Sequence, residues 1–438
     1  MRGFLLYASS YICNMYIEDI YQIYKQYPSI QTDTRELRKN DLFFALKGPN
    51  FNANIFAKQA LEKGAAFIVV DEKTSFTDDR IIQTEDVLDT LQRLAKFHRQ
   101  QFNIPFIAIT GSNGKTTTKE LAHAVLSSSF ITYTTEGNLN NHIGVPLTIL
   151  KIKPDAQFAI IEMGANHLGE IAGYCEYAMP THGLITNIGK AHLEGFGGLD
   201  NVKKGKGELF DYLRKHEGIA FINADDNAIV EISKGFHTTI SYGTTGEDVH
   251  GKLIMSDPFA EVLIDTIPPL EIQTNLAGGY NFYNIMAAVS IGRYFGVEEQ
   301  KIKSAIENYK PSNSRSQLIH SGSNTIILDA YNANPGSMKA AIENFAAMKG
   351  DKKILLLGAM MELGADSRKE HTNLIALIDK YKWEAVVLVG KNFNDLPHKY
   401  INYENPIQAK DWLREQQFEN AQLMIKGSRS MQMEKVLE

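Results

Sequence analysis

The chain has 438 residues, a length that as a soft prior suggests about three domains. Its composition, 44% hydrophobic and 22% charged, is ordinary for a soluble globular protein. A net charge of −6 provides no electrostatic footprint for nucleic acid or for an anionic membrane. Cys13 and Cys175 offer neither a disulfide framework nor a metal-ligand pair, which fits a reducing compartment, and no apolar run reaches the length of a membrane span.

The first residues resemble the start of a secretory signal, but the apolar run breaks at Ser9 and Ser10 without a cleavage site. We therefore expect residues 1–14 to be an upstream extension and Met15 to be the functional start.

Residues 15–103 mix short strands and helices and predict a small α/β domain. Strands are expected within 41–48 and at 66–70, and helices at 56–63 and 87–97.

Residues 104–310 alternate between strands and helices, which predicts a parallel sheet with crossover helices. The expected strands are 106–109, 158–164, 183–188 and 218–223, followed by short antiparallel strands in 248–275 and a helix at 282–295.

Residues 311–438 restart the alternation after the polar turn Pro311–Ser314. The expected strands are 325–329, 354–358, 386–390 and 423–427, separated by helices near 337–348, 368–381 and 430–437. The predicted fold class is α/β with three domains: a small α/β substrate domain, a central parallel-sheet domain with a phosphate loop, and a doubly wound, Rossmann-like C-terminal domain.

The stretch Thr110–Thr118 is a glycine-rich turn between a buried strand and a helix. Such a turn cradles phosphate with backbone N–H groups and the positive helix end, while Lys115 supplies a charge and the Thr116 hydroxyl a magnesium ligand. Ile109 stands where the full pattern has glycine, so the loop is a shortened variant. The competing interpretation is a glycine turn with a surface lysine. We predict that this loop binds a nucleoside triphosphate.

Several polar residues fall at the carboxyl ends of the predicted strands, where active groups of parallel sheets gather: Thr116, Glu162, Asn187 and Asn223. A carboxylate at position 162 is able to hold the magnesium that Thr116 also touches. The alternative is a solvated glutamate at a strand end.

Other candidates are ambiguous from residue type alone. His192 also fits a surface or capping histidine, and Lys206 a solvated lysine. Asn281 and Asn284 share a helical face that suits an adenine edge, but Asn281 also fits an ordinary helix cap. Arg315 lies on the segment between two predicted domains, where its side chain is able to reach a phosphate bound by the neighbouring domain. The alternative is an ordinary surface arginine.

Seven segments of the chain together resemble the Mur ligase family, whose members build the peptide stem of bacterial peptidoglycan. The segments are TGSNGKTT (110–117), GNLNNHIGVPLT (137–148), IEMGAN (161–166), AHLEGFG (191–197), NADD (223–226), DAYNANP (329–335) and MELG (361–364). They occur in the family's order and cover nearly the whole chain after Met15.

The resemblance implies three sets of site residues. ATP is expected at Gly111, Ser112, Asn113, Gly114, Lys115, Thr116, Thr117, Asn281, Arg315, Asp329 and Tyr331. Substrate is expected at Thr34, Arg35, Lys47, Gly48, Asn138, Asn140, Asn332 and Asn334. Two magnesium ions are expected on Thr116, Glu162, His192 and a carbamylated Lys206, with Lys115, Glu162, His192 and Lys206 as the catalytic group.

The family usually has histidine where Tyr280 stands and glycine where Ser314 stands. Both departures lie next to residues that are expected to grip the nucleotide. They affect local nucleotide geometry rather than the reaction.

Within the family, the segment 331–335 points to the ligase that joins D-alanyl-D-alanine to UDP-N-acetylmuramoyl-tripeptide through an acyl phosphate. The implied domains are 15–103 for the UDP-sugar, 104–310 for ATP, and 311–438, which closes on ATP and binds the dipeptide. We expect a cytoplasmic monomer. The alternatives are a sister ligase that adds a single amino acid, a non-catalytic nucleotide-binding subunit and a kinase that phosphorylates a hydroxyl.

Overall fold

The computed structural model describes residues 15–311 and 314–438. The expectation about residues 1–14 lies outside this part, as do two residues of the predicted boundary at 311–314. Among the described residues, no helix is both long and apolar enough to cross a bilayer. The predicted α/β class with parallel sheets is confirmed.

The chain forms two compact units. Of the described residues, the first contains 15–104 together with two later segments, 135–156 and 173–179, and the second contains the remainder. The predicted domain boundaries at 103/104 and 310/311 stay predictions.

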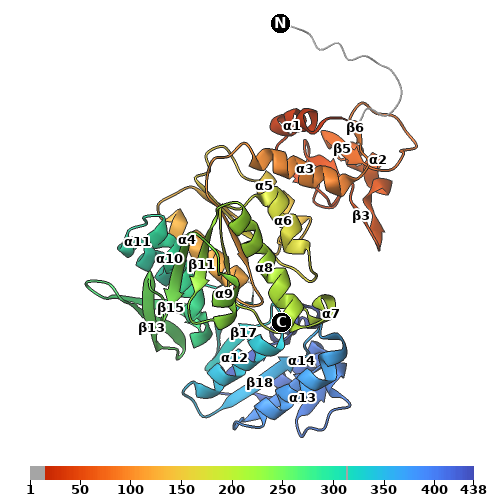
Figure 1. Ribbon diagram of the computed structural model, residues 1–438. Coiled ribbons are helices and arrows are strands. Elements are labelled where there is room, and N and C mark those ends of the chain that lie inside the picture. The colour runs from red at the N-terminus through yellow and green to blue at the C-terminus, as the bar shows by residue number, and fades with distance from the viewer. Residues whose placement is uncertain (1–14, 312–313) are drawn as a thin grey trace. The chain divides into compact units, whose positions relative to one another are not determined.

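The first unit has a four-stranded parallel sheet and a two-stranded hairpin (Figure 1). The sheet order is β1 (Ile30–Gln31), β2 (Leu42–Phe44), β5 (Phe67–Val70) and β6 (Ile81–Gln83), and the hairpin pairs β3 (Lys47–Gly48) with β4 (Phe51–Asn52). Its helices are α1 (Ile17–Gln26), η1 (Ala53–Phe56), α2 (Ala57–Glu62), α3 (Val87–Arg99) and α5 (Gly144–Leu150).

Helix α3 shows how this unit is built. Asp86 caps its first turn by accepting a hydrogen bond from the Asp89 N–H at 2.8 Å. Leu91 and Leu94 are fully buried on one helical face. At the other end, the Arg99 guanidinium donates to the carbonyls of Phe102, Ala178 and Met179, which fixes the segment 173–179 to this unit.

The second unit contains a nine-stranded sheet. Its order is β15 (Leu270–Ala277), β14 (Phe259–Ile264), β13 (Val249–Met255), β12 (Thr239–Gly243), β11 (Ile219–Asn223), β10 (His182–Ile185), β7 (Phe106–Thr110), β9 (Phe158–Glu162) and β8 (Thr132–Thr134). All pairs from β8 to β13 are parallel, and β13, β14 and β15 pair antiparallel, as predicted for 248–275.

The helices of this sheet are α4 (Lys115–Ser127), α7 (Leu193–Phe196), α8 (Leu199–Lys215), α9 (Asn227–Ile232), η2 (Gly279–Asn281), α10 (Phe282–Tyr294) and α11 (Glu299–Asn308). Most of α6 (Glu170–Ala178) belongs to the segment 173–179 of the first unit. The crossover from β7 to β8 and the crossover from β10 to β11 run in opposite directions along the sheet. Because such crossovers are right-handed, α4 and α8 cover opposite faces. Helices α10 and α11 pack beside α4, and Leu121, Val125, Ile285 and Val289 fill the core between them.

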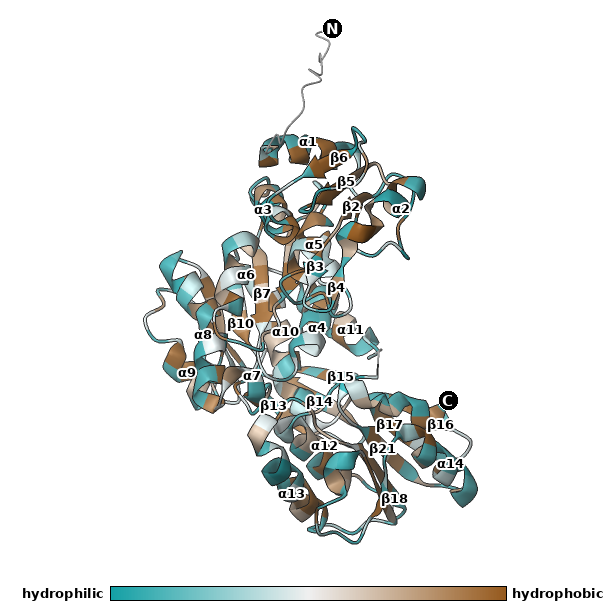
Figure 2. Cartoon of the chain, turned by 90° about the vertical axis from the view of Figure 1, so that its right-hand side faces the viewer, coloured by the Kyte–Doolittle hydropathy of each residue, from teal (hydrophilic) through white to brown (hydrophobic). Residues whose placement is uncertain are grey.

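A six-stranded sheet completes the second unit. Its order is β16 (Gln317–Ser321), β17 (Asn324–Asp329), β21 (Gln422–Lys426), β18 (Lys353–Gly358), β19 (Ala385–Val389) and β20 (Ile401–Tyr403). Only β16 is antiparallel. Strands β18 and β21 are apolar and buried, and Figure 2 colours them brown.

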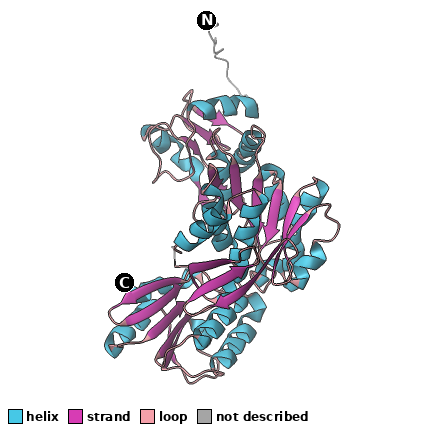
Figure 3. Cartoon of the chain, turned by 90° about the vertical axis from the view of Figure 1, so that its left-hand side faces the viewer, coloured by secondary structure: helices cyan, strands magenta, loops and turns pink. Residues whose placement is uncertain are grey.

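Helices lie on both faces of this sheet (Figure 3). They are α12 (Pro335–Ala347), η3 (Gly364–Asp366), α13 (Ser367–Ile378), η4 (Lys391–Phe393), α14 (Pro406–Gln416), η5 (Arg429–Met431) and η6 (Met433–Leu437). Helices α12 and α13 pack together, and α14 packs with η6. The expected helix 430–437 forms two 3-10 turns instead, because Gln432 between them is left-handed, with φ of 50°.

The ring of His182 packs among Phe221, Tyr294 and Phe295 at one end of β10. Burial lowers the pKa of His182 from 6.5 to about 4. The unfolded chain therefore binds more protons than the folded chain between these two pH values, and stability falls as pH drops from 6.5 toward 4.

We expect His182→Phe to remove this part of the acid sensitivity, which is on the order of 2–3 kcal/mol at most. Urea unfolding at pH 7 and pH 4.5 measures it, with the exposed His237→Phe as the matched control. An equal loss of stability on acidification in both variants would contradict the assignment.

Candidate active site

The predicted phosphate loop connects β7 to α4 through two glycines with positive φ, Gly111 at 142° and Gly114 at 80°. Gly114 is the N-cap of α4, so the helix begins at Lys115. A Cβ on Gly114 would collide with Oδ1 of Asn284. Both the backbone and the space therefore require glycine.

The end of β10 holds the loop in place. The Asn187 side chain accepts from the Asn113 N–H at 3.0 Å and donates to the Asn113 carbonyl at 2.9 Å. Thr186 Oγ1 donates to the same carbonyl at 2.5 Å, and the Ser112 N–H donates to the Asn187 carbonyl at 3.0 Å. These bonds fix the loop to its neighbouring strand, since β10 and β7 are adjacent.

A second support comes from α10. The Thr118 hydroxyl donates to Asn284 Oδ1 at 3.0 Å, and Asn284 Nδ2 donates to Asn281 Oδ1 at 2.9 Å. Asn281 in turn donates to the Ala277 carbonyl at 2.9 Å and makes no side-chain helix cap. These two amides thus connect the strand before α10 to the helix that follows the loop, and their contact with adenine stays a prediction.

The Lys115 ammonium donates to the loop carbonyls of Gly111, at 2.7 Å, and Ser112, at 3.3 Å. Burial lowers the pKa of Lys115, Glu162 acts to raise it, and Arg315 lowers it further. The structure therefore brings Lys115, Glu162 and Arg315 within electrostatic reach of one another.

Lys206 lies in the middle of α8 and is 1% exposed. Its Nζ donates to the Ala165 carbonyl at 3.3 Å and lies 5.3 Å from the centre of the Phe196 ring. Burial, and then the positive charge of Lys115, lower the pKa of Lys206 to about 7, although Glu170 and Glu208 act in the opposite direction. A substantial part of this amine is neutral at physiological pH, unlike a solvated lysine.

Glu162 ends β9, beside the strand that leads into the phosphate loop, and is 1% exposed. Its Oε2 lies 4.0 Å from Nζ of Lys119, which is a buried residue of helix α4. Thr116 is buried at the start of the same helix. Among the residues that the structure describes, no group of three or more His, Cys, Asp or Glu side chains is arranged as a metal site.

The donor chemistry of Thr116 and Glu162 nevertheless fits magnesium, which prefers a few oxygen ligands and completes its shell with water and substrate phosphates. The Lys206 amine does not fit as it stands, because an ammonium repels a cation. Its carbamate would supply the oxygen ligands that magnesium prefers.

His192 precedes α7 in a left-handed conformation, with φ of 51°, and makes no side-chain helix cap. Its Nδ1 lies 2.6 Å from Oε2 of Glu362, in the loop after β18. The contact with His192 is the main cause that lowers the pKa of the Glu362 carboxyl. Two segments are thus in contact here, and the neighbouring ion pair between Lys190 and Glu370, at 2.7 Å, joins them as well.

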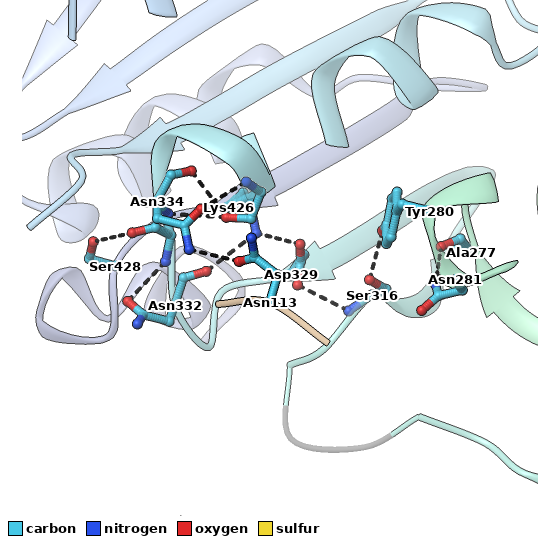
Figure 4. A network of polar contacts seen from close by, with 12 residues as sticks. Asn113, Ala277, Tyr280, Asn281, Ser316, Asp329, Asn332, Asn334, Lys426 and Ser428 are labelled. Carbon is cyan, nitrogen blue, oxygen red and sulfur yellow. Dashed lines mark hydrogen bonds and ion pairs between the residues drawn. The ribbon is translucent and has the colours of Figure 1, made fainter. Parts of the chain in front are cut away.

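The expected loop after β17 forms a polar network (Figure 4). Asp329 pairs with the buried Lys426 at 2.5 Å, and Lys426 also donates to the Asn332 carbonyl at 3.3 Å. The Arg315 guanidinium lies 3.5 Å from the centre of the Tyr331 ring, and Arg429 lies 5.5 Å from the same centre. Cations therefore gather around Tyr331 and Asp329.

Asn334 joins this network to the phosphate loop. Its Nδ2 donates to Asn113 Oδ1 at 2.7 Å, while its Oδ1 caps α12 by accepting from the Ser337 N–H at 2.9 Å (Figure 4). The Ser337 hydroxyl accepts in return from the Asn334 N–H, which completes a capping box. The positive end of α12 thus lies beside the loop, where it favours an anion.

Of the two departures from the family pattern, Ser314 lies in the segment that leads to β16, and Tyr280, in η2, contacts that segment. Ser314 is left-handed, with φ of 56°, a conformation that glycine adopts more easily. The Tyr280 hydroxyl bonds the Ser316 hydroxyl at 2.8 Å, and the Ser316 N–H donates to Asp329 at 3.3 Å. Tyr280 thereby supports the segment that carries Arg315.

The remaining expected substrate residues belong to the first unit. Arg35 is paired in a bidentate manner with Asp33, and Lys47 lies 3.6 Å from Asp71 and 3.7 Å from Glu72. The other four expected residues lie in turns or at the hairpin: Thr34, Gly48, Asn138 and Asn140. Nothing in the unit tests their contact with a sugar nucleotide.

Sequence reasoning assigned no site role to several residues of this network: Lys119, Thr186, Lys190, Glu362, Lys426 and Arg429. One signal was available, because Lys426 is a charged residue at the carboxyl end of a predicted buried strand. The Glu362 contact has no local signal, since it depends on two distant segments.

The phosphate loop allows a direct test of its backbone. We expect Gly114→Ala to weaken binding of a non-hydrolysable ATP analogue by at least about tenfold, because the left-handed backbone alone costs roughly 1–2 kcal/mol and the collision with Asn284 adds to it. Titration calorimetry measures the affinity. Gly322→Ala is the control, since Gly322 is left-handed with open space around it; equal effects of both variants on affinity would disprove the steric argument.

Comparison with known proteins places these features in a family. Residues 109–292 match the model of the Mur ligase middle domain, and residues 314–424 match that of the Mur ligase glutamate ligase domain. The UDP-N-acetylmuramoyl-tripeptide–D-alanyl-D-alanine ligase of Bacillus subtilis is 33% identical over 425 residues, covering 93% of this chain and 92% of the relative. The enzyme of the same name from Escherichia coli is 35% identical over 426 residues, with the same coverage.

Comparison with solved structures gives the same family as the sequence relatives. MurF from Acinetobacter baumannii superposes with a TM-score of 0.86 at 31% identity, covering 93% of this chain and 92% of that one. A MurF ligase from Thermotoga maritima in complex with ADP has a TM-score of 0.83 at 28% identity, covering 93% and 96%. The chain therefore belongs to the Mur ligase family and, within it, to the MurF group.

Proposed function

We infer that this protein is an ATP-dependent ligase that joins D-alanyl-D-alanine to UDP-N-acetylmuramoyl-tripeptide in peptidoglycan synthesis. The names of relatives above 30% identity across 93% of the chain support the substrates. The observation that carries the chemistry is the phosphate loop with Lys115, beside the buried Glu162 and Lys206. Because the reaction consumes ATP, we place the protein in the cytoplasm.

In the proposed first step, the terminal carboxylate of the tripeptide attacks the γ-phosphorus of ATP. A carboxyl oxygen–phosphorus bond forms and the bond to the β-phosphate oxygen breaks, which yields an acyl phosphate and ADP. Negative charge gathers on the transferred group, so Lys115 and Arg315 stabilise it electrostatically. The N-terminal ends of α4 and α12 add their partial positive charges.

In the second step, the amine of D-alanyl-D-alanine attacks the acyl carbon. The tetrahedral intermediate expels phosphate, the amine loses a proton, and an amide bond remains. The network around Asp329 and Asn334 lies beside the phosphate loop, so we assign to it the grip on the nucleotide and on the incoming dipeptide. Exclusion of water by these segments protects the acyl phosphate from hydrolysis.

Magnesium and a modified lysine complete the proposal. Thr116 and Glu162 would hold one ion, and His192 and carbamylated Lys206 a second, and these ions would offset the charge of the phosphates. Carbamylation joins the neutral Lys206 amine to carbon dioxide and releases one proton. The lowered pKa of Lys206 supports this chemistry, because only the unprotonated amine reacts.

Product analysis tests the reaction. With ATP, magnesium, UDP-N-acetylmuramoyl-tripeptide and D-alanyl-D-alanine, mass spectrometry should detect the UDP-pentapeptide, with one phosphate released for each amide. Omission of the dipeptide should stop amide formation. Ligation of a single amino acid instead would indicate a sister ligase, and the absence of any amide product would disprove the function.

Lys206→Ala should lose at least about 100-fold in kcat and recover part of it with short-chain carboxylic acids, which replace the carbamate oxygens. Lys203→Ala on the same helix, where Lys203 forms a more exposed ion pair with Glu231, is the control. For the protein without substitutions, at limiting bicarbonate, activity should fall as the pH drops below about 7, because Lys206 becomes protonated there. Full activity of Lys206→Ala without additive would exclude the carbamate.

A further inference from the structure

The loops that follow β17, β18 and β21 meet at Ser428, at the carboxyl edge of the six-stranded sheet (Figure 4). The Ser428 hydroxyl donates to the Ala333 carbonyl at 3.3 Å and accepts from the Met361 N–H at 2.8 Å. The Ser428 N–H donates to the Ala359 carbonyl at 3.3 Å. Active groups of parallel sheets gather at this edge. The next residue, Arg429, therefore extends from backbone that two neighbouring loops hold in place.

The packing behind Arg429 is tight. Met433 is fully buried, and a Cβ on Gly358 or Gly427 would lie 2.7 or 2.6 Å from its Cγ. The short helix η5, which begins at Arg429, therefore cannot shift without disturbing the ends of β18 and β21. The Arg429 side chain itself is 65% exposed. An exposed cation on a fixed backbone suits the capture of an anion, because little reorganisation is needed when the anion binds.

The cations of this edge differ in how far they are already engaged. Lys426 is buried and paired with Asp329. Arg315 lowers the pKa of Lys115, so it lies within electrostatic reach of the phosphate loop. Arg429, in contrast, has a long ion pair with Glu434, at 3.4 Å.

The ring of Tyr331 gives Arg429 its place. Its centre lies 5.5 Å from the Arg429 guanidinium and 3.5 Å from that of Arg315. A guanidinium within about 6 Å of an aromatic ring is attracted to it. The two arginines therefore occupy neighbouring positions beside one ring, and Arg429 keeps N–H donors of its fork for a second anion.

The incoming dipeptide carries such an anion. Its amine must reach the acyl carbon beside the phosphates, and its carboxylate lies at the other end, at most about 7 Å farther along the chain of two residues. The carboxylate and the triphosphate repel each other, so the carboxylate needs a cation that does not serve the nucleotide. A guanidinium matches a carboxylate with two parallel hydrogen bonds.

We propose that Arg429 binds the terminal carboxylate of D-alanyl-D-alanine, while Arg315 serves the nucleotide. This role rests on the proposed function and deepens it. It also gives a physical reason for selecting a dipeptide, because a single amino acid carries its carboxylate next to its amine and does not reach a cation placed one residue farther away.

The experiment compares D-alanyl-D-alanine with D-alanyl-D-alaninamide, in which a neutral carboxamide replaces the carboxylate. The full chain is used, with ATP, magnesium and UDP-N-acetylmuramoyl-tripeptide at saturation. In the protein without substitutions, the KM should be about 10–100-fold higher for the amide, as expected for loss of a charge-assisted hydrogen bond. Arg429→Met should raise the KM for the dipeptide by a similar factor and leave that for the amide unchanged.

Two further variants complete the comparison. Arg429→Lys keeps the charge but loses the fork, so its KM for the dipeptide should be intermediate. Arg414→Met is the matched control, because Arg414 is an exposed arginine in the last turn of α14, shortly before β21 begins. It should leave the KM for both acceptors unchanged. The KM for ATP should stay within about twofold in all three variants.

Equal KM values for dipeptide and amide in the protein without substitutions would overturn the proposal, and this comparison requires no variant to fold. So would a rise in KM for both acceptors in Arg429→Met, or a rise in the KM for ATP as its main effect, which would assign Arg429 to the nucleotide. Pentapeptide formation with any of these results refutes only the role of Arg429. The absence of pentapeptide from the protein without substitutions would instead refute the proposed function.

Discussion

The site depends on hydrogen bonds that hold the phosphate loop in an otherwise unfavourable backbone conformation. Asn187, which follows β10, and Asn284 from α10 bind the loop and its helix from two sides. Gly114 occupies the left-handed position that this arrangement requires. Two of the loop N–H groups, those of Ser112 and Asn113, already donate to Asn187, so the shape of the loop is set before any anion binds.

Burial of charge is the second constraint on the site. Lys115 and Lys206 are close enough for one to lower the pKa of the other, and Glu162 is as deeply buried as Lys206. Two buried ammonium groups beside each other are costly, and loss of a proton from Lys206 relieves the cost. The same burial that would make a lysine a poor structural residue makes this one a suitable amine for carbamylation.

Much of the fold could be predicted because its signals are local. The buried strands 67–70 and 354–358 and the helices 87–97 and 282–295 occur close to the predicted bounds, since apolar periodicity and capping residues act over a few neighbours. The helix expected at 430–437 was wrong, because one left-handed residue divides it.

The site was predictable only in part. The phosphate loop follows from its spacing, and the seven shared motifs indicate the other candidates. The contacts of His192 with Glu362 and of Asn113 with Asn334 were not predictable, because they depend on how two sheets pack. Asn113 and Asn334 are 221 positions apart in the chain. Residue type alone also left Lys206 indistinguishable from a solvated lysine until its burial was known.

The oxygen and the nitrogen of the Asn334 side-chain amide have different roles. Its oxygen fixes the first turn of α12, and its nitrogen reaches Asn113 in the phosphate loop. Aspartate would preserve the turn but bring a negative charge toward the triphosphate, and serine would preserve the turn without spanning the gap. Helix initiation and the link to the phosphate loop are therefore carried by the same few atoms, so a substitution that spares the helix still removes the hydrogen bond between the two segments.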